Sequence, residues 1–185
     1  MKNIYIELNG GKKPTKGSEH AAAYDLYVKE DYELSKSRHI IPTGICMQLP
    51  VGWKANVRPR SGFSAKGMEV EVKTTYRRFN GEEYISRETT RIDADVLLGL
   101  IDCDYRDEIG VIVRVHSLDA VARQRYEFDT IVENHIIITR GTRIAQLEIC
   151  GGEHRLVVVD KIDRTIDRGG GYGHTGTGNE QGGTA

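Results

Sequence analysis

Hydrophobic and polar residues alternate over many short stretches of this 185-residue chain. Successive side chains of a β-strand point to opposite faces of a sheet, so a period of two is typical of a strand with one buried face. The alternation predicts strands at Ile4, Ile6 and Leu8, at Ile45, Met47 and Leu49, at Trp53, Ala55 and Val57, and at Ile109, Val111, Val113 and Val115. Further strands are expected at 68–78, 82–92, 94–101, 134–139, 143–149 and 155–160.

Turn signals rich in glycine and proline separate these segments. They lie at Asn9-Gly10-Gly11, Pro42-Thr43-Gly44, Pro50-Val51-Gly52, Asn80-Gly81, Arg140-Gly141 and Gly151-Gly152. Only residues 118–128, with the sequence LDAVARQRYEF, fit a short helix. Many short strands joined by regular turns predict an all-β barrel or sandwich with one short helix at most.

The chain is expected to form one domain over 1–166, followed by a flexible glycine-rich arm over 167–185. Two segments of this domain look inserted. Residues 68–92 carry alternating charges around Asn80-Gly81, which is a strong hairpin signal. Residues 116–135 contain the possible helix. Neither segment has a recognisable catalytic pattern, so both are expected at the periphery.

The bulk composition is that of an ordinary globular protein, with 38% hydrophobic and 29% charged residues. The net charge of −1 gives no global positive field, so direct binding to nucleic acid or to an anionic membrane is not expected. The three cysteines and six histidines are scattered, without disulfide or metal-ligand spacing. No signal peptide or membrane-spanning stretch stands out, and a cytoplasmic location is therefore the expectation.

The stretch 99–106 (GLIDCDYR) is the first candidate for chemistry. An apolar strand ends there in a carboxylate, so Asp102 is expected to emerge where the sheet ends and a pocket can begin. A carboxylate in that place can hold and deprotonate a water molecule, while Tyr105 offers a flat face to a sugar or a base. Many strands end in aspartate, so the stretch alone is a weak signal.

Residues 58–66 (RPRSGFSAK) have the ingredients of a phosphate-binding loop. Arg60 can place its guanidinium on phosphate oxygens, Ser61 donates a hydroxyl, and Gly62 lets backbone N–H groups approach closely. A basic surface turn has the same composition, so this alternative stays open.

Two polar residues lie among apolar neighbours. Gln146 interrupts the apolar pattern of 143–149, and a buried amide needs a partner such as a ligand or a metal-bound water. Asp25 lies at a strand start, where it orients water around a magnesium ion or caps a turn. Each also fits a purely structural role.

The arm contains an arginine, an aromatic and a hydroxyl within a few residues, at Arg168, Tyr172 and Thr175. This combination fits a lid that stacks on a base, reaches phosphates and excludes water. The alternative is a solvated tail, which is the better interpretation for 177–185.

Taken in order, these five segments resemble the five motifs of the trimeric dUTP diphosphatases, or dUTPases. The pieces RSG…K, GLIDCDYR and GTRIAQL are close to the family patterns. The resemblance implies a jelly-roll-like β fold assembled as a homotrimer, with active sites at subunit interfaces. It also implies the hydrolysis of dUTP to dUMP and pyrophosphate with Mg²⁺, an activity that keeps uracil out of DNA.

The resemblance also implies roles for single residues. Asp102 would be the catalytic residue that activates the attacking water, and Tyr105 would pack under the deoxyribose and exclude ribonucleotides. Asp25 would contact the magnesium ion through water, with the ion held mainly by the substrate phosphates. The other implied substrate-binding residues are Arg60, Ser61, Gly62, Val96, Gly99, Ile101, Gln146, Arg168, Tyr172, Gly173, His174 and Thr175.

The chain also departs from the family pattern. Ala22-Ala23 stands where Ala-Gly is usual, and Asp107 replaces a glycine. Tyr172 replaces the usual phenylalanine and follows Arg168 one residue earlier than in the family. The two insert-like segments make the chain longer than typical members, as in dUTPases of bacteriophages and their hosts.

Two other functions compete with this interpretation. A dCTP deaminase shares the fold, but it would need a catalytic glutamate and an Arg-Ser-Ser cradle, whereas this chain has Asp102 and Arg60-Ser61-Gly62. The second is a regulatory module that binds a protein partner through 68–92 or 116–135. The extra length of these segments without catalytic residues motivates it, and binding and catalysis can coexist.

Overall fold

The computed structural model describes residues 1–118 and 130–172 of the chain. These parts form fourteen β-strands and one short α-helix, which confirms the all-β expectation. In chain order the elements are β1 (Lys2–Leu8), β2 (Thr15–Lys16), β3 (Tyr24–Tyr27), β4 (Tyr32–Glu33), β5 (Arg38–Pro42), β6 (Ile45–Gln48), β7 (Lys54–Arg58), α1 (Ser61–Lys66), β8 (Met68–Arg77), β9 (Glu83–Val96), β10 (Gly99–Ile101), β11 (Gly110–Ser117), β12 (Thr130–Ile138), β13 (Arg143–Cys150) and β14 (His154–Val159).

The strands pair into three sheets around one core. The five-stranded sheet β10-β7-β13-β3-β2 and the six-stranded sheet β4-β12-β8-β9-β11-β5 are antiparallel. The third sheet, β14-β1-β6, contains a parallel pair, β1 with β14. All three sheets send alternate side chains inward, and the largest fully buried ones are Ile4, Ile6, Leu26, Ile41, Ile45, Met47, Met68, Ile92, Ile109, Ile138, Ile144 and Leu147.

The alternating segments are strands, as predicted, whereas β2, β4 and β5 were not predicted, and β3 was indicated only by the expected strand start at Asp25. The reason is local: β2 and β4 have only two residues, and β3 buries three residues in succession instead of alternating. The expected strands 82–92 and 94–101 are arranged differently, because β9 runs continuously to Val96 and β10 is separate.

The helix of the described residues is α1, inside the segment expected to be a phosphate-binding turn. It has six residues and buries only Phe63, so the sequence shows no helical periodicity that would predict it. The helix expected at 118–128 lies almost wholly outside the described residues. In the described parts of the chain no helix has the length and apolar character needed to cross a lipid bilayer.

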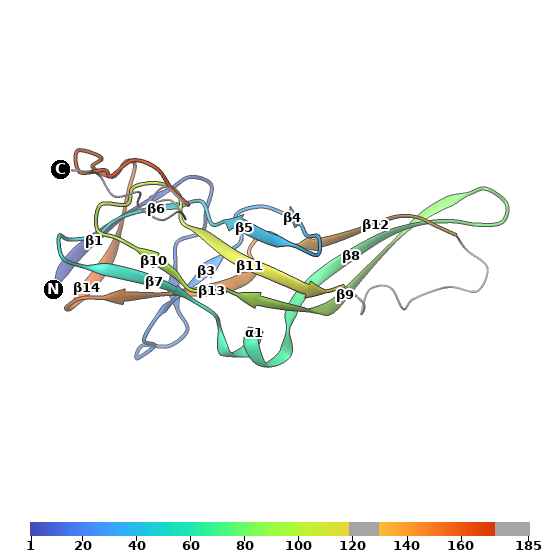
Figure 1. The fold of residues 1–185 in the computed structure, drawn as a ribbon, viewed down its shortest axis with the longest axis horizontal. Helices are drawn as coiled ribbons and strands as arrows, with labels where there is room; N and C mark the ends of the chain where they lie inside the picture. The colour runs from blue at the N-terminus through green and yellow to red at the C-terminus, as the bar shows by residue number, and fades with distance from the viewer. Residues whose placement is uncertain (119–129, 173–185) are drawn as a thin grey trace, which may run out of the picture.

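A three-stranded ribbon projects from the barrel, at the right of Figure 1. Strands β8 and β9 form the hairpin expected around Asn80-Gly81, with Gly81 at a φ of 87° in its turn. Strand β12 runs beside β8, with Thr130 opposite Arg77. The two segments that looked inserted, 68–92 and 116–135, therefore contribute to one projecting sheet.

Candidate active site

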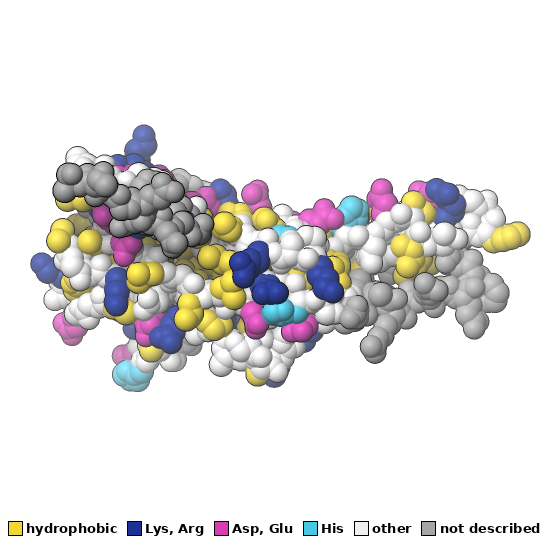
Figure 2. Space-filling view, in the orientation of Figure 1, with side chains coloured by type: hydrophobic (Ala, Val, Ile, Leu, Met, Phe, Trp, Pro, Cys, Tyr) yellow, Lys and Arg dark blue, Asp and Glu magenta, His cyan; other side chains and the backbone are white. Residues whose placement is uncertain are grey.

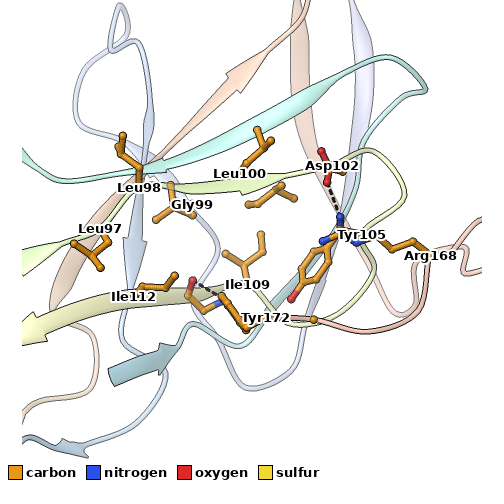
Figure 3. A pocket seen from close by; sticks show the side chains of 14 residues that line it. Leu97, Leu98, Gly99, Leu100, Asp102, Tyr105, Ile109, Ile112, Arg168 and Tyr172 are labelled. Atoms are coloured by element: carbon orange, nitrogen blue, oxygen red, sulfur yellow. Dashed lines mark hydrogen bonds and ion pairs between the residues drawn. The ribbon is translucent and has the colours of Figure 1, made fainter. Parts of the chain in front are cut away.

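A cavity of about 350 Å³ opens where two neighbouring strands part. Strand β11 pairs with β9, and next to this pairing the Leu97 N–H donates to the Ile112 carbonyl oxygen at 2.8 Å. Beyond Leu97 the chain turns away and β10 joins β7 of the other sheet, with Ile101 opposite Ala55. Strands β10 and β11 therefore diverge, and the cavity, which we call the fork cavity, lies between them (Figure 3).

Asp102 and Tyr105 face this cavity from the turn that follows β10. The Tyr105 N–H donates to the Asp102 carbonyl oxygen at 3.2 Å, which closes a four-residue turn. The Tyr105 side chain is buried, and its hydroxyl donates to the Glu108 carbonyl oxygen at 2.9 Å. The Asp102 side chain is 43% exposed, so water reaches the carboxylate. The turn thus holds the water-accessible carboxylate of Asp102 beside the fixed ring of Tyr105.

Arg106 fastens this turn to the segment that leads into the arm. Its side chain is only 3% exposed and donates to three carbonyl oxygens: Asp163 at 2.8 Å, Cys103 at 2.7 Å and Tyr105 at 3.0 Å. A buried guanidinium is stable only when its donors are used, and here they bridge two distant parts of the chain. Arg106 is therefore a positioning residue for the turn.

The beginning of the arm covers the carboxylate. Arg168 Nη1 lies 2.5 Å from Asp102 Oδ2, and the guanidinium carbon lies 5.2 Å from the centre of the Tyr105 ring. The Arg168 N–H also donates to the Asp104 carbonyl oxygen at 3.1 Å. An ion pair and a cation–π contact thus hold the arm on the side of the cavity that carries Asp102.

Tyr172 lies at the other side of the cavity, against Gly110 (Figure 3). Its hydroxyl donates to the Gly110 carbonyl oxygen and accepts from the Gly110 N–H, each at 2.7 Å. A Cβ at residue 110 would lie 2.6 Å from that hydroxyl oxygen, so only glycine allows this approach. Gly110 therefore offers one backbone donor and one backbone acceptor to the cavity.

Burial raises the pKa of both phenols that line the cavity. The pKa of Tyr105 rises to about 12, because burial and then the neighbouring Tyr172 and Asp107 disfavour its charged form. Burial also raises the pKa of Tyr172, although its bond with Gly110 acts in the opposite direction. Both hydroxyls are protonated at neutral pH and can donate hydrogen bonds.

A second polar cluster lies on the sheet that contains β3 and β13. Asp25 and Gln146 are direct neighbours across these strands. The Asp25 side chain is buried and accepts hydrogen bonds from Arg60 Nε at 3.1 Å and from Arg143 Nη1 at 3.4 Å. Two guanidiniums around one carboxylate leave excess positive charge, which favours an anion nearby.

The cluster adjoins a basic cavity of about 640 Å³ at α1. Arg60 is the N-cap residue of α1 and lines this cavity together with Gly62 and Arg143. Ser61 begins the helix and is exposed. The cavity is also lined by Lys12, Lys66 and Arg91, with one carboxylate, Glu69.

The two cavities lie toward opposite ends of β7. Ala55, near the start of this strand, is opposite Ile101, so Asp102, the next residue after Ile101, lies near the start of β7. Arg60 follows the other end, after Arg58. At roughly 3.4 Å per residue, the three steps from Ala55 to Arg58 alone span about 10 Å. Within one chain, Asp102 and Arg60 therefore line separate cavities.

Within the described parts of the chain, the predicted site residues other than Val96 fall into two groups. Gly99, Ile101, Asp102, Tyr105, Arg168 and Tyr172 line the fork cavity. Asp25, Arg60, Ser61, Gly62 and Gln146 belong to the second cluster and the adjoining start of α1. Val96 belongs to neither group, because it is packed in the core and the next residues, Leu97 and Leu98, line the fork cavity instead. Gly173, His174 and Thr175 lie outside the described residues.

Sequence reasoning assigned no role to Arg106, Gly110 or Arg143. An isolated glycine inside the apolar strand 109–115 is a known signal for close approach, and it would have marked Gly110. For Arg106 and Arg143 no such signal exists, because an arginine next to a turn is normally solvated.

Comparisons with known proteins point to one family. A family model described as dUTPase matches residues 10–86. The deoxyuridine 5′-triphosphate nucleotidohydrolase of Syntrophotalea carbinolica is 33% identical over 185 residues, covering 95% of this chain and 99% of the relative. The Candida albicans protein of the same name is 29% identical over 178 residues, covering 94% and 86%.

Solved structures of phage dUTPases share the fold. A structure of the Staphylococcus bacteriophage 80alpha dUTPase has a TM-score of 0.56 at 20% identity, covering 94% of this chain and 98% of that chain. The dUTPase from phage phi11 of S. aureus, described as showing a species-specific insert, has a TM-score of 0.56 at 16% identity, covering 86% and 97%.

The β-barrel carries the fork cavity, with a carboxylate at its edge, and a separate basic cavity, a combination that suits a phosphorylated ligand. The match with the S. carbinolica protein, which extends over nearly the whole of both chains, is more specific. This chain belongs to the dUTPase family.

Proposed function

We propose that this protein is a dUTP diphosphatase, which hydrolyses dUTP to dUMP and pyrophosphate. One observation carries the proposal: in a chain of the dUTPase family, the water-accessible carboxylate of Asp102 lies beside a fixed tyrosine ring at the edge of a cavity. The activity would keep uracil out of DNA and supply dUMP. The free thiols of Cys46, Cys103 and Cys150 support a reducing compartment, and we place the protein in the cytoplasm.

In the proposed reaction Asp102 accepts a proton from a water molecule, whose oxygen attacks the α-phosphorus. A bond forms between this oxygen and the α-phosphorus while the bond to the oxygen that bridges to the β-phosphorus breaks. The water oxygen stays with dUMP, and pyrophosphate leaves. Because Arg168 covers Asp102 in the free chain, its guanidinium moves onto the phosphates when the nucleotide binds. Charge neutralisation and positioning supply most of the rate in such reactions.

The base would lie in the fork between β10 and β11. The Gly110 N–H and carbonyl oxygen match a carbonyl and the N–H of uracil, whereas cytosine presents an amino group and an unprotonated nitrogen at the same edge. Gly99 lines the fork from β10. The Tyr105 ring would pack under the deoxyribose and leave no room for a 2′-hydroxyl.

Arg60, Ser61, Gly62 and Gln146 would bind the phosphates. Since Arg60 and Asp102 lie toward opposite ends of β7, we propose that the phosphates lie between Asp102 of one copy and the basic cavity of another. This supports a homotrimer with sites at its interfaces. Apolar side chains gather over β10 and β11 in Figure 2, and Leu98 and Leu100 are exposed there, which suits a contact between subunits.

The arm would close over the bound nucleotide. Arg168 would reach the γ-phosphate, and Tyr172 would stack on the uracil ring. Gly173, His174 and Thr175 would complete the phosphate shell, and their roles stay predictions because these residues lie outside the described parts of the chain.

Mg²⁺ is the expected cofactor, and one dUTPase structure from phage phi11 is described as coordinating a structural Mg(II) ion. Among the described residues, no three His, Cys, Asp or Glu side chains gather into a metal cage, and both Asp25 oxygens accept from arginines. We propose that the ion is held mainly by the substrate phosphates, with Asp25 in contact through water. When bound, Mg²⁺ offsets the triphosphate charge and helps pyrophosphate leave.

Separate incubations with dUTP and with dCTP, each with Mg²⁺, test the proposed activity. We expect pyrophosphate from dUTP and no ammonia from dCTP. Ammonia from dCTP together with inert dUTP would replace the diphosphatase by a deaminase.

A second function, binding of a regulatory protein, has the projecting ribbon in its favour. At its tip Phe79 is fully exposed, and Ile85 on β9 is 55% exposed. The related phage phi11 enzyme is described as having a species-specific insert. We propose that the ribbon binds a protein partner beside the catalytic function.

Point substitutions test the ribbon better than deletion, because removal of β8 would leave β12 without its partner strand. We expect Phe79→Ser with Ile85→Ser to abolish capture of a partner found with the unchanged protein, while dUTP turnover persists. Val51→Ser, at an exposed apolar position outside the ribbon, is the control. Equal capture by all three proteins would reject the ribbon as the binding surface.

A further inference from the structure

The Tyr172 hydroxyl is bonded to both polar groups of Gly110 that face the fork cavity. One oxygen donates to the carbonyl and accepts from the N–H, at 2.7 Å in both cases. A uracil edge offers the same pair, an N–H donor next to a carbonyl acceptor. The phenol therefore reproduces the hydrogen bonds that a pyrimidinedione base would make at this residue.

The N–H and carbonyl of Gly110 point to the same side of β11 as those of Ile112, away from β5, because residues two apart in a strand direct their polar groups to one side. On that side the Leu97 N–H bonds to the Ile112 carbonyl oxygen, and beyond Leu97 the chain diverges to β10, so no strand lies opposite Gly110 there. Without Tyr172, the N–H and carbonyl of Gly110 would face the cavity unpaired, which is costly in a partly dry site.

The same stretch of arm also engages the catalytic carboxylate. Arg168 pairs with Asp102 at 2.5 Å, and Gly171 lines the cavity between the two anchors. Residues 168–172 thus contact the cavity at both of its polar ends. A nucleotide base on Gly110 and the Tyr172 hydroxyl on Gly110 exclude each other.

We propose that in the free enzyme the Tyr172 hydroxyl is a built-in competitor for the base, holding the arm on Gly110 until a pyrimidinedione displaces it. This inference rests on the proposed function and deepens it. Displacement frees the phenol ring to stack on the base that replaced it, so the arm closes on the nucleotide only after the correct base has taken over both hydrogen bonds. A phenylalanine at position 172 would keep the ring for stacking and lack the competing hydroxyl.

Tyr172→Phe tests the competitor, with deoxyuridine as the probe because it has the base and no phosphate. Two neutral hydrogen bonds of ordinary net strength correspond to roughly a thirtyfold change in an equilibrium constant. We therefore expect calorimetry to show deoxyuridine binding about thirtyfold tighter to Tyr172→Phe than to the unchanged enzyme. Tyr32→Phe, outside the cavity, is the matched control and should bind as the unchanged enzyme does.

Amide hydrogen exchange of Gly110 gives a second measurement that needs no ligand. We expect its exchange to be slow in the unchanged enzyme and at least about tenfold faster in Tyr172→Phe, because the bond to the hydroxyl is gone. Equal exchange in both proteins, or deoxyuridine binding that is equal or weaker in Tyr172→Phe, would overturn the inference. If dUTP turnover is normal in the unchanged enzyme at the same time, the proposed function survives and only the competitor is rejected.

Discussion

Replacement of Arg106 by methionine is a demanding test of how the site is held together. The guanidinium is 3% exposed and its three hydrogen bonds, at 2.7 to 3.0 Å, connect the Asp102–Tyr105 turn with Asp163 before the arm. Methionine has a similar length and suits a buried place, but it donates no hydrogen bond. The substitution therefore leaves three carbonyl oxygens without their donor.

The expected loss of stability follows from these bonds. Each hydrogen bond from a charged group contributes about 1.5–3 kcal/mol. The gain from no longer burying a charge offsets more than half of the sum, so we expect a net loss of about 3 kcal/mol. For a chain of this size 1 kcal/mol corresponds to about 2–4 °C, which predicts a Tm lower by roughly 6–12 °C.

Thermal unfolding and dUTP turnover, both at one fixed subunit concentration, measure the effect. Well below the Tm we also expect kcat/KM to fall about tenfold, because the turn with Asp102 and the base of the arm lose their common anchor. Arg114→Met is the matched control, since Arg114 is exposed and its expected change is within about 0.5 kcal/mol. The same Tm and the same kcat/KM in Arg106→Met and Arg114→Met would show that Arg106 does not hold the turn in place.

Three further predictions concern the arm, Gly110 and the ion pair of Glu7 with Arg164. A chain ending at Asp167 should lose most of its turnover while its Tm changes by less than about 3 °C, because the arm contributes little to the core; full activity would show that the arm is not a lid. Gly110→Ala should raise the KM for dUTP at least about tenfold, because the added Cβ would lie 2.5 Å from the Ile40 side chain and obstruct the base; an unchanged KM contradicts this. The Arg164 guanidinium holds the pKa of Glu7 below its usual range, so their contact stabilises the fold above about pH 4.3 and is lost as the pH falls through the lowered pKa. In Glu7→Gln the free energy of unfolding should therefore decrease less steeply as the pH falls below about 4.3. An identical decrease in both proteins would argue against the contact.

The long strands were predictable because a strand with one buried and one solvent-exposed face alternates hydrophobic and polar residues. Strand β8 shows this, since Met68, Val70 and Val72 are buried and their neighbours are not. The rule fails where a strand is very short or buried on both faces. Strand β3, with Asp25 and Leu26 both buried, is such a case.

The lining of the fork cavity was predictable where a side chain carries a chemical signal, and less so where the backbone lines it. Asp102 and Tyr105 were predicted to face a pocket because a carboxylate and an aromatic follow a strand end, and both line this cavity. The N–H and carbonyl of Gly110 face the cavity only because the chain leaves β11 after Leu97 and β10 pairs with β7 instead. The residue types at these positions do not predict such a change of partner strand. The separation of Asp102 from Arg60 along β7 likewise depends on strand pairing.

Single-turnover hydrolysis of dUTP by Asp102→Asn shows whether Asp102 takes the proton from the attacking water. Asparagine keeps the size of the side chain and its ability to accept a hydrogen bond, but it is no base at neutral pH. We predict that the variant binds a non-hydrolysable dUTP analogue with a Kd within about threefold of the unchanged enzyme, while the rate of pyrophosphate release falls at least about a hundredfold. A release rate within a few-fold of the unchanged enzyme, at equal nucleotide occupancy, would show that Asp102 is not the base.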